Sequence, residues 1–147
     1  MALDRILELV VLLNEDMTES LARDGLTTSR ARVLWELRQR GPTTQRALAD
    51  ALGVSARTVT GLVDGLAATG FVTREPHPTD RRATHVTFTK HGIRTVEAME
   101  REQQEFAHLL FSQMPAERFR CLYDGLGDIL DRLREQGLTN TIREGDR

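Results

Sequence analysis

Residues 45–64 read QRALADALGVSARTVTGLVD, two short helical segments joined by a tight turn. Gly53 lies at the turn, where a backbone conformation with positive φ is cheap for glycine. Ser55 follows it and can cap the second helix, while Ala49 is small enough for the two helices to approach closely. The core between them is assigned to Leu48, Val54, Val59 and Leu62. This pattern is typical of a helix-turn-helix motif.

The rest of the chain predicts long helices on both sides of this motif and a β-hairpin directly after it. Apolar residues spaced by three and four positions predict helices at 2–22, 28–39, 44–52, 55–68, 90–112 and 115–136. Alternating patterns predict strands at 71–74 and 84–88, joined by a polar, proline-containing loop at 75–83. Residues 139–147 are expected to form a frayed tail. The predicted fold class is mainly α with a small β-hairpin wing.

The second helix of the motif carries small, hydroxylated and guanidinium side chains off its apolar face, mostly in its first half. Such a surface can enter the major groove of duplex DNA, with arginine on a guanine edge and threonine on bases, methyl groups or phosphates. The helix N-terminus can also hold a phosphate. The predicted DNA-binding residues of the motif are Thr44, Gln45, Ser55, Arg57, Thr58 and Thr60.

The hairpin adds a second predicted contact with DNA. Arg81 and Arg82 lie in its loop, where they can reach the backbone or minor groove next to the recognition helix. Arg74 lies on the strand that enters the loop. Asp80 would repel phosphate if it were unpaired, so we expect it to brace Arg82 or Arg74. All four residues belong to the predicted DNA-binding set.

The distribution of charge favours the middle of the chain as the part that meets phosphate. The whole chain has a formal net charge of −2. Residues 43–90, in contrast, hold six basic and four acidic side chains, a local charge of +2. A second hypothesis is a helical dimeric protein-interaction module without specific DNA binding. Only DNA binding predicts an affinity that falls steeply with salt and prefers one sequence.

Composition excludes several other classes of protein. No apolar run approaches the roughly 20 residues that span a bilayer, and the N-terminal segment lacks the features of a signal peptide. A single cysteine, Cys121, allows no intrachain disulfide, so we expect a reducing, cytoplasmic setting. Cys121 itself is expected to be a buried, inert thiol.

No pattern of catalytic or metal-binding residues is visible. There is no Ser-His-Asp, Cys-His or glycine-rich phosphate-binding motif. The four histidines, at positions 77, 85, 91 and 108, are scattered, and position 112 is serine where a second helical zinc ligand would lie. We therefore expect neither an enzyme, nor a cofactor, nor a metal site.

The chain resembles the multiple antibiotic resistance regulator (MarR) family over residues 3–133. The most specific similarity is the wing, in which Arg74 and a proline-containing loop precede Asp80-Arg81-Arg82 and then Val86-Thr87-Phe88-Thr89-Lys90-His91-Gly92. Ser55, the run Thr58-Val59-Thr60 and the run Leu62-Val63-Asp64 are similar to the family's recognition helix. Gly61 departs from the pattern, since many members carry a basic residue there.

The resemblance implies a homodimer in which the terminal helices of two chains interlock and two recognition helices read a palindromic operator. Three long amphipathic helices at the chain ends support this, because their apolar surface exceeds what the central unit can cover. The expected organisation is one 1–147 protomer with a winged helix-turn-helix unit at 28–90 and dimerisation helices at 1–24 and 91–137. The resemblance also implies repression relieved by a small-molecule effector, with Trp35, His85, Phe106 and Tyr123 as candidate pocket residues.

Overall fold

The computed structural model describes residues 1–138 of the 147, so the expected tail at 139–147 lies outside the described residues. Contacts divide the chain into two compact units, residues 1–96 and residues 97–147. The elements are α1 (Ala2–Arg23), α2 (Thr28–Arg40), α3 (Gln45–Leu52), α4 (Ala56–Ala68), β1 (Val72–Pro76), β2 (Thr84–Phe88), α5 (Lys90–Phe111) and α6 (Ala116–Glu135). All six predicted helices and both strands are confirmed, with ends that differ by at most two residues.

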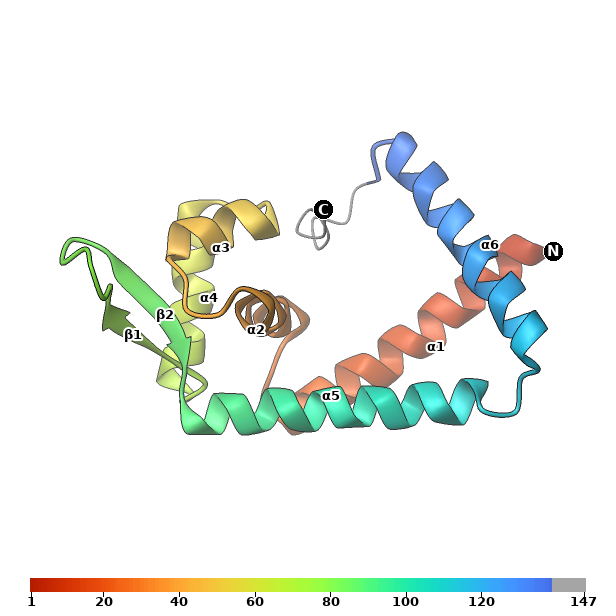
Figure 1. The fold of residues 1–147 in the computed structure, drawn as a ribbon, viewed down its shortest axis with the longest axis horizontal. Coiled ribbons are helices and arrows are strands. Elements are labelled where there is room, and N and C mark those ends of the chain that lie inside the picture. Colours follow the sequence, from red (N-terminus) through yellow and green to blue (C-terminus); the bar gives the residue numbers. More distant parts are fainter. Residues whose placement is uncertain (139–147) are drawn as a thin grey trace. The chain divides into compact units, whose positions relative to one another are not determined.

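The core of the first unit lies where α2, α3 and α4 meet the hairpin (Figure 1). Its fully buried side chains include Leu34, Leu37, Leu48, Val59, Val63, Leu66 and Val86. Burying one such leucine contributes about 1.5–3 kcal/mol to the free energy of unfolding. Val54 and Leu62, which the sequence assigned to the core, are only half-buried. The buried residues of α4 are Val59, Val63 and Leu66.

Local hydrogen bonds position the two helices of the motif as the sequence predicts. The Thr44 hydroxyl accepts the N–H of Ala47 at 3.2 Å at the start of α3. Gly53 ends α3 in the left-handed region, with φ of 64°. The Ser55 hydroxyl then accepts the N–H of Thr58 at 3.1 Å and caps α4. Caps of this kind contribute about 0.5–2 kcal/mol each.

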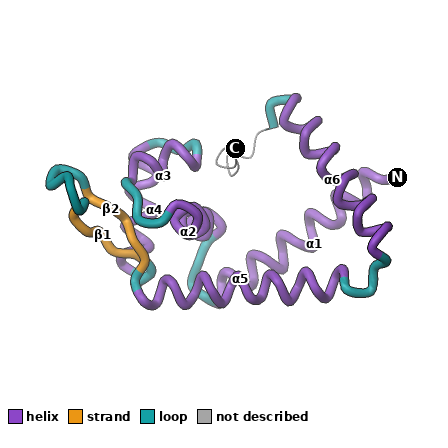
Figure 2. The backbone as a smooth tube through the Cα atoms, viewed as in Figure 1, coloured by secondary structure: helices purple, strands orange, loops and turns teal. Residues whose placement is uncertain are grey.

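The wing is an antiparallel pair of strands, drawn in orange in Figure 2, that ends in a long loop. The register pairs Val72 with Phe88 and Pro76 with Thr84. Strand β1 therefore runs two residues beyond the predicted end at Arg74. Thr43 adds an isolated bridge, since its N–H donates to the Val86 carbonyl at 3.2 Å and its carbonyl accepts the N–H of Val86 at 2.7 Å. This bridge ties the segment before α3 to the wing.

The start of α5 packs tightly against the base of the wing. The Thr89 hydroxyl donates to the Gly70 carbonyl at 2.5 Å and accepts the N–H of Gly92 at 3.0 Å. A side chain at Gly92 would collide with the carbonyl group of Phe71 and lie 3.0 Å from the Phe88 ring. Only glycine therefore allows the helix to approach the strand this closely.

The second unit contains the C-terminal part of α5 and the whole of α6. Pro115 precedes the first turn of α6, and the Phe111 and Phe119 rings meet edge to face with centroids 5.3 Å apart. This unit exposes a series of large apolar side chains: Phe106, Leu109, Leu110, Phe119, Leu122, Leu126, Ile129, Leu130 and Leu133. In the first unit, α1 exposes Leu3, Leu7, Leu9, Val10, Val11, Leu12, Leu13 and Met17. Within residues 1–138, no helix has the length and apolar character that crossing a membrane requires.

Candidate nucleic-acid interface

The N-terminal half of α4 presents a polar, solvent-facing surface. Arg57, Thr58, Thr60 and Gly61 are all exposed. Within residues 1–138, the Arg57 guanidinium has no hydrogen-bond or ion-pair partner, so its five N–H donors are free to bind another molecule. The Ser55 and Thr58 hydroxyls lie 2.9 Å apart and together shape the start of the helix. This half of the helix can present a cation and hydroxyl groups to a groove.

The Thr60 side chain is already engaged within the protein. Its hydroxyl donates to the Ala56 carbonyl one turn earlier at 2.8 Å and accepts the Gln45 side-chain amide at 3.0 Å. Thr60 can therefore offer an outside ligand its methyl group and a remaining acceptor site, but no O–H donor.

Arg74 is held by two partners from different helices. Its Nε donates to Gln45 Oε1 at 2.8 Å and one terminal nitrogen donates to Asp64 Oδ1 at 2.6 Å. The expectation that Asp80 braces Arg74 is wrong, because Asp64 takes that place. The sequence contained a signal for this pair. The chain reverses at Gly70, which lies six positions after Asp64 on the helix and four positions before Arg74 on the strand.

The tip of the wing is organised around two polar side chains, His77 and Asp80. His77 Nδ1 accepts the backbone N–H groups of Thr79 and Asp80, each at 3.1 Å. Asp80 Oδ1 accepts the backbone N–H of Arg82 at 3.0 Å. Asp80 thus holds the main chain at Arg82 rather than the guanidinium, which corrects the predicted brace.

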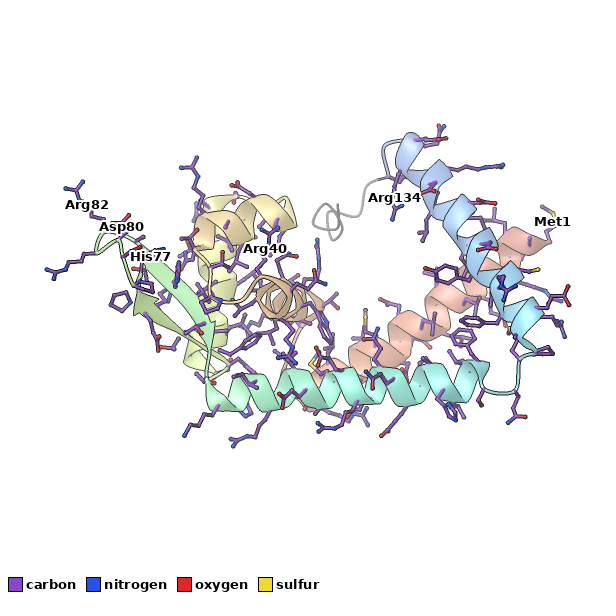
Figure 3. The ribbon with its side chains drawn as sticks, in the orientation of Figure 1. Met1, Arg40, His77, Asp80, Arg82 and Arg134 are labelled. Carbon is purple, nitrogen blue, oxygen red and sulfur yellow. The ribbon has the colours of Figure 1, made fainter. Side chains whose placement is uncertain are left out.

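The two arginines of the wing loop are exposed. Neither the Arg81 nor the Arg82 guanidinium has an ion-pair partner in the described part of the chain. Figure 3 shows the Arg82 side chain extending away from the hairpin, beyond His77 and Asp80. A cationic tip of this kind can reach a phosphate backbone.

The candidate pocket residues lie in four different elements. Trp35 is half-buried in α2, and His85 in β2 stacks edge-on against His77 with ring centroids 4.3 Å apart. Phe106 in α5 and Tyr123 in α6 are exposed. Their role in binding an effector stays a prediction.

Cys121 is exposed, so the expectation of a buried thiol is wrong for the single chain. In residues 1–138, no group of three or more His, Cys, Asp or Glu side chains has the arrangement of a metal site.

Sequence reasoning missed a further cation beside the recognition helix. The Arg30 guanidinium from α2 lies directly over Gly65 of α4, where a Cβ atom would come within 2.7 Å of Cζ. Glycine at this position therefore leaves room for an arginine from the neighbouring helix. The signal available in the sequence was a second glycine, four residues after Gly61, on the same side of the helix.

Two helices joined by a glycine turn, followed by a two-stranded wing, define a winged helix-turn-helix protein. The sequence profile of the MarR family matches residues 26–84. The transcriptional regulator MT0903.1 of Mycobacterium tuberculosis, named as HTH-type, is 33% identical over 105 residues, which cover 71% of this chain and 68% of the regulator. The chain belongs to the MarR family.

Two further comparisons agree with this assignment. The HTH-type transcriptional repressor NicR of Pseudomonas putida is 33% identical over 99 residues, 67% of this chain. The matching region spans 63% of NicR, less than two thirds of its length. The structure of FabT from Streptococcus pneumoniae in complex with DNA has the same fold, with a TM-score of 0.75 at 19% identity over 90% of this chain and 98% of FabT. The curated relatives carry the names of transcriptional regulators, in agreement with the prediction that the chain is not an enzyme.

Proposed function

We propose that this chain is a sequence-specific DNA-binding transcription regulator that acts as a homodimer on a palindromic operator. The observation that carries the proposal is a group of three exposed arginines that have no partner among residues 1–138, Arg57 on α4 and Arg81 and Arg82 at the tip of the wing. Arginine guanidinium groups bind guanine edges and phosphates with two parallel hydrogen bonds. The shared fold of FabT, whose structure contains DNA, supports the same role.

In this proposal the recognition helix α4 contacts bases and the wing contacts the adjacent DNA backbone or minor groove. Arg57 and Thr58 read bases in the major groove, and Ser55 at the N-terminus of α4 holds a phosphate. Thr44 stands at the corresponding end of α3 and can contact the backbone. Arg81 and Arg82 bind the adjacent backbone or minor groove, while Asp80 shapes the loop that carries them. The DNA-binding unit is then residues 28–90.

A homodimer is supported by the apolar side chains that a single chain exposes. Residues 1–24 and 91–137 contain the exposed leucines and valines of α1 and the exposed apolar residues of α5 and α6. Monomeric proteins seldom expose apolar patches of this extent. We assign both segments to dimerisation. A two-fold axis between the chains would place two recognition helices on two half-sites about one helical turn apart.

Repression, a small-molecule effector and a cytoplasmic location complete the proposal. The name of NicR as a repressor supports the first, and the family resemblance supports the second. Trp35, His85, Phe106 and Tyr123 are the candidate effector contacts. The cytoplasmic location is supported by the presence of a single cysteine and by the target, since an operator lies inside the cell.

Selection of bound sequences from a random duplex library tests the proposal. The purified protein is incubated with the library at about 0.15 M salt, the physiological ionic strength. We expect an inverted repeat whose half-sites lie about 10 base pairs apart. A protein that enriches no sequence, and whose binding to duplex DNA at low salt is also absent, would instead be the protein-interaction module.

A further inference from the structure

Four side chains connect the recognition helix, the preceding helix and the wing. Asp64 on α4 accepts from Arg74 on β1 at 2.6 Å, Arg74 donates to Gln45 on α3 at 2.8 Å, and Gln45 donates to Thr60 on α4 at 3.0 Å. We call these four residues the Arg74 network. It leaves α4 at Asp64, passes through the wing and α3, and returns to α4 at Thr60, so it closes a loop across three elements.

The geometry of Arg74 turns its guanidinium toward the protein. The side chain is 33% exposed, whereas its partner Asp64 is 60% exposed. Two of its five N–H donors, one on Nε and one on a terminal nitrogen, are already occupied. A guanidinium that binds two partners in this way is fixed in both position and plane, because its fork is rigid. A phosphate could use these two donors only by displacing Gln45 or Asp64.

We propose that Arg74 is a positioning residue, which fixes the wing relative to α3 and α4, and is not itself a contact with DNA. The inference rests on the proposed function, because it concerns how the two DNA-binding elements keep their spacing. Through Gln45 the same network also holds the hydroxyl of Thr60. One arginine therefore fixes both the angle of the wing and the orientation of the Thr60 side chain on the recognition helix.

Removal of the Asp64 carboxylate distinguishes the Arg74 network from simple electrostatics. Asp64 is a carboxylate on the helix that meets DNA, so simple electrostatics predicts that removing it strengthens binding to a polyanion. The Arg74 network predicts the opposite, because loss of the carboxylate releases Arg74 and the wing. Asp50 on α3 provides a matched control, since it is an exposed aspartate whose carboxylate has no partner within residues 1–138.

The experiment measures affinity and its salt dependence for wild type, Arg74→Ala, Arg74→Lys, Asp64→Ala and Asp50→Ala. The probes are a fluorescent duplex of the sequence that wild type enriches from the random library and a random-sequence duplex of equal length. We expect Arg74→Ala and Asp64→Ala each to weaken specific binding by about fivefold to tenfold, the loss expected when the net contribution of about one hydrogen bond is removed. A double variant that combines Arg74→Ala with Asp64→Ala should bind the specific duplex no more weakly than the weaker of the two single variants.

Arg74→Lys separates positioning from phosphate contact. Lysine keeps the positive charge but lacks the fork, so a positioning role predicts that this variant binds as weakly as Arg74→Ala. The slope of log affinity against log salt should equal that of wild type in both variants. A slope reduced by about 1.8 in Arg74→Ala, which is about 0.9 for each of the two subunits, with near-normal binding by Arg74→Lys, would show a phosphate contact and overturn the proposal. Tighter binding by Asp64→Ala, as expected for Asp50→Ala, would overturn it as well.

A measurement without DNA distinguishes failure of this inference from failure of the proposed function. Amide hydrogen exchange in β1 and β2 should become faster in Arg74→Ala, Arg74→Lys and Asp64→Ala, and should stay at the wild-type rate in Asp50→Ala. Unchanged exchange in the first three variants would refute the Arg74 network. Faster exchange in a protein that prefers no duplex would support the network and reject sequence-specific DNA binding.

Discussion

Replacing Gly61 with alanine should stabilise the folded protein and weaken its binding to DNA at the same time. Gly61 is the sixth residue of the 13-residue helix α4, is exposed, and has no atom within 4 Å of the position that a Cβ would take. No contact within residues 1–138 therefore requires glycine here. In the interior of an exposed helix, glycine costs about 0.5–1 kcal/mol relative to alanine. Gly61 lies on the same face of α4 as Arg57, which is one turn earlier.

The expected gain in stability follows from these values. Gly61→Ala should raise the free energy of unfolding by about 0.5–1 kcal/mol, a rise in Tm of about 1–4 °C for a chain of this size. If glycine lets α4 lie closer to the bases than the basic residue of many family members would, the added methyl group must push the helix outward. Adding a methyl group to a close-packed contact costs about 1–3 kcal/mol, which is fivefold or more in affinity.

The assay combines thermal unfolding with binding to the selected duplex and to a random duplex. Gly65→Ala is the matched control in the same helix, because its methyl group must displace the end of the Arg30 side chain and should therefore give a smaller gain in Tm. Specific binding by Gly61→Ala should fall, while binding to the random duplex stays unchanged. An unchanged or lower Tm for Gly61→Ala would refute the conclusion that a Cβ at this position meets no other atom. A higher Tm with undiminished specific affinity would refute the close approach to DNA.

Three further substitutions test the base of the wing and the two proposed DNA-binding surfaces. Gly92→Ala should lower the free energy of unfolding by at least about 2 kcal/mol, measured by denaturant titration, because its methyl group would collide with the Phe71 carbonyl; a smaller loss would contradict the tight junction. Arg57→Ala should cost about 1–3 kcal/mol of specific binding and relax sequence preference, and an equal loss on random DNA would mean that Arg57 contacts the backbone. Arg82→Ala should weaken DNA binding and leave the proposed dimer intact in analytical ultracentrifugation, and a variant that is monomeric where wild type is a dimer would contradict its place on the wing.

Much of the fold was predictable because its determinants are local in the sequence. The turn at Gly53 and the cap at Ser55 involve atoms within four residues of each other, and both are present as expected. Helical and alternating spacing predicted every element, since the periods of a helix and a strand appear directly in the order of apolar residues. The exposure of Arg57 also follows from its place on the polar face of α4.

The pairing of charged side chains in the candidate site depended on the path of the chain. Asp64 and not Asp80 binds Arg74, because the strand β1 runs back beside α4 while the loop directs the Asp80 carboxylate to its own backbone. Strand β1 also continues to Pro76, since pairing with β2 extends it beyond its own alternating pattern. Neither result follows from residues that are neighbours in sequence.

The sequence by itself determined where helices, turns and caps form, which residues are polar on α4, and the winged helix-turn-helix class. Tertiary structure decided which arginine is bound within the protein and which is free, since a guanidinium binds whatever acceptor the neighbouring element brings within reach. It also gave the three helical glycines of the first unit, Gly61, Gly65 and Gly92, three different surroundings: open space, an arginine side chain and a backbone carbonyl. The physical reason is the separation in sequence of the interacting residues. Local structure depends on interactions over a few residues, whereas these contacts form only after distant segments have packed together.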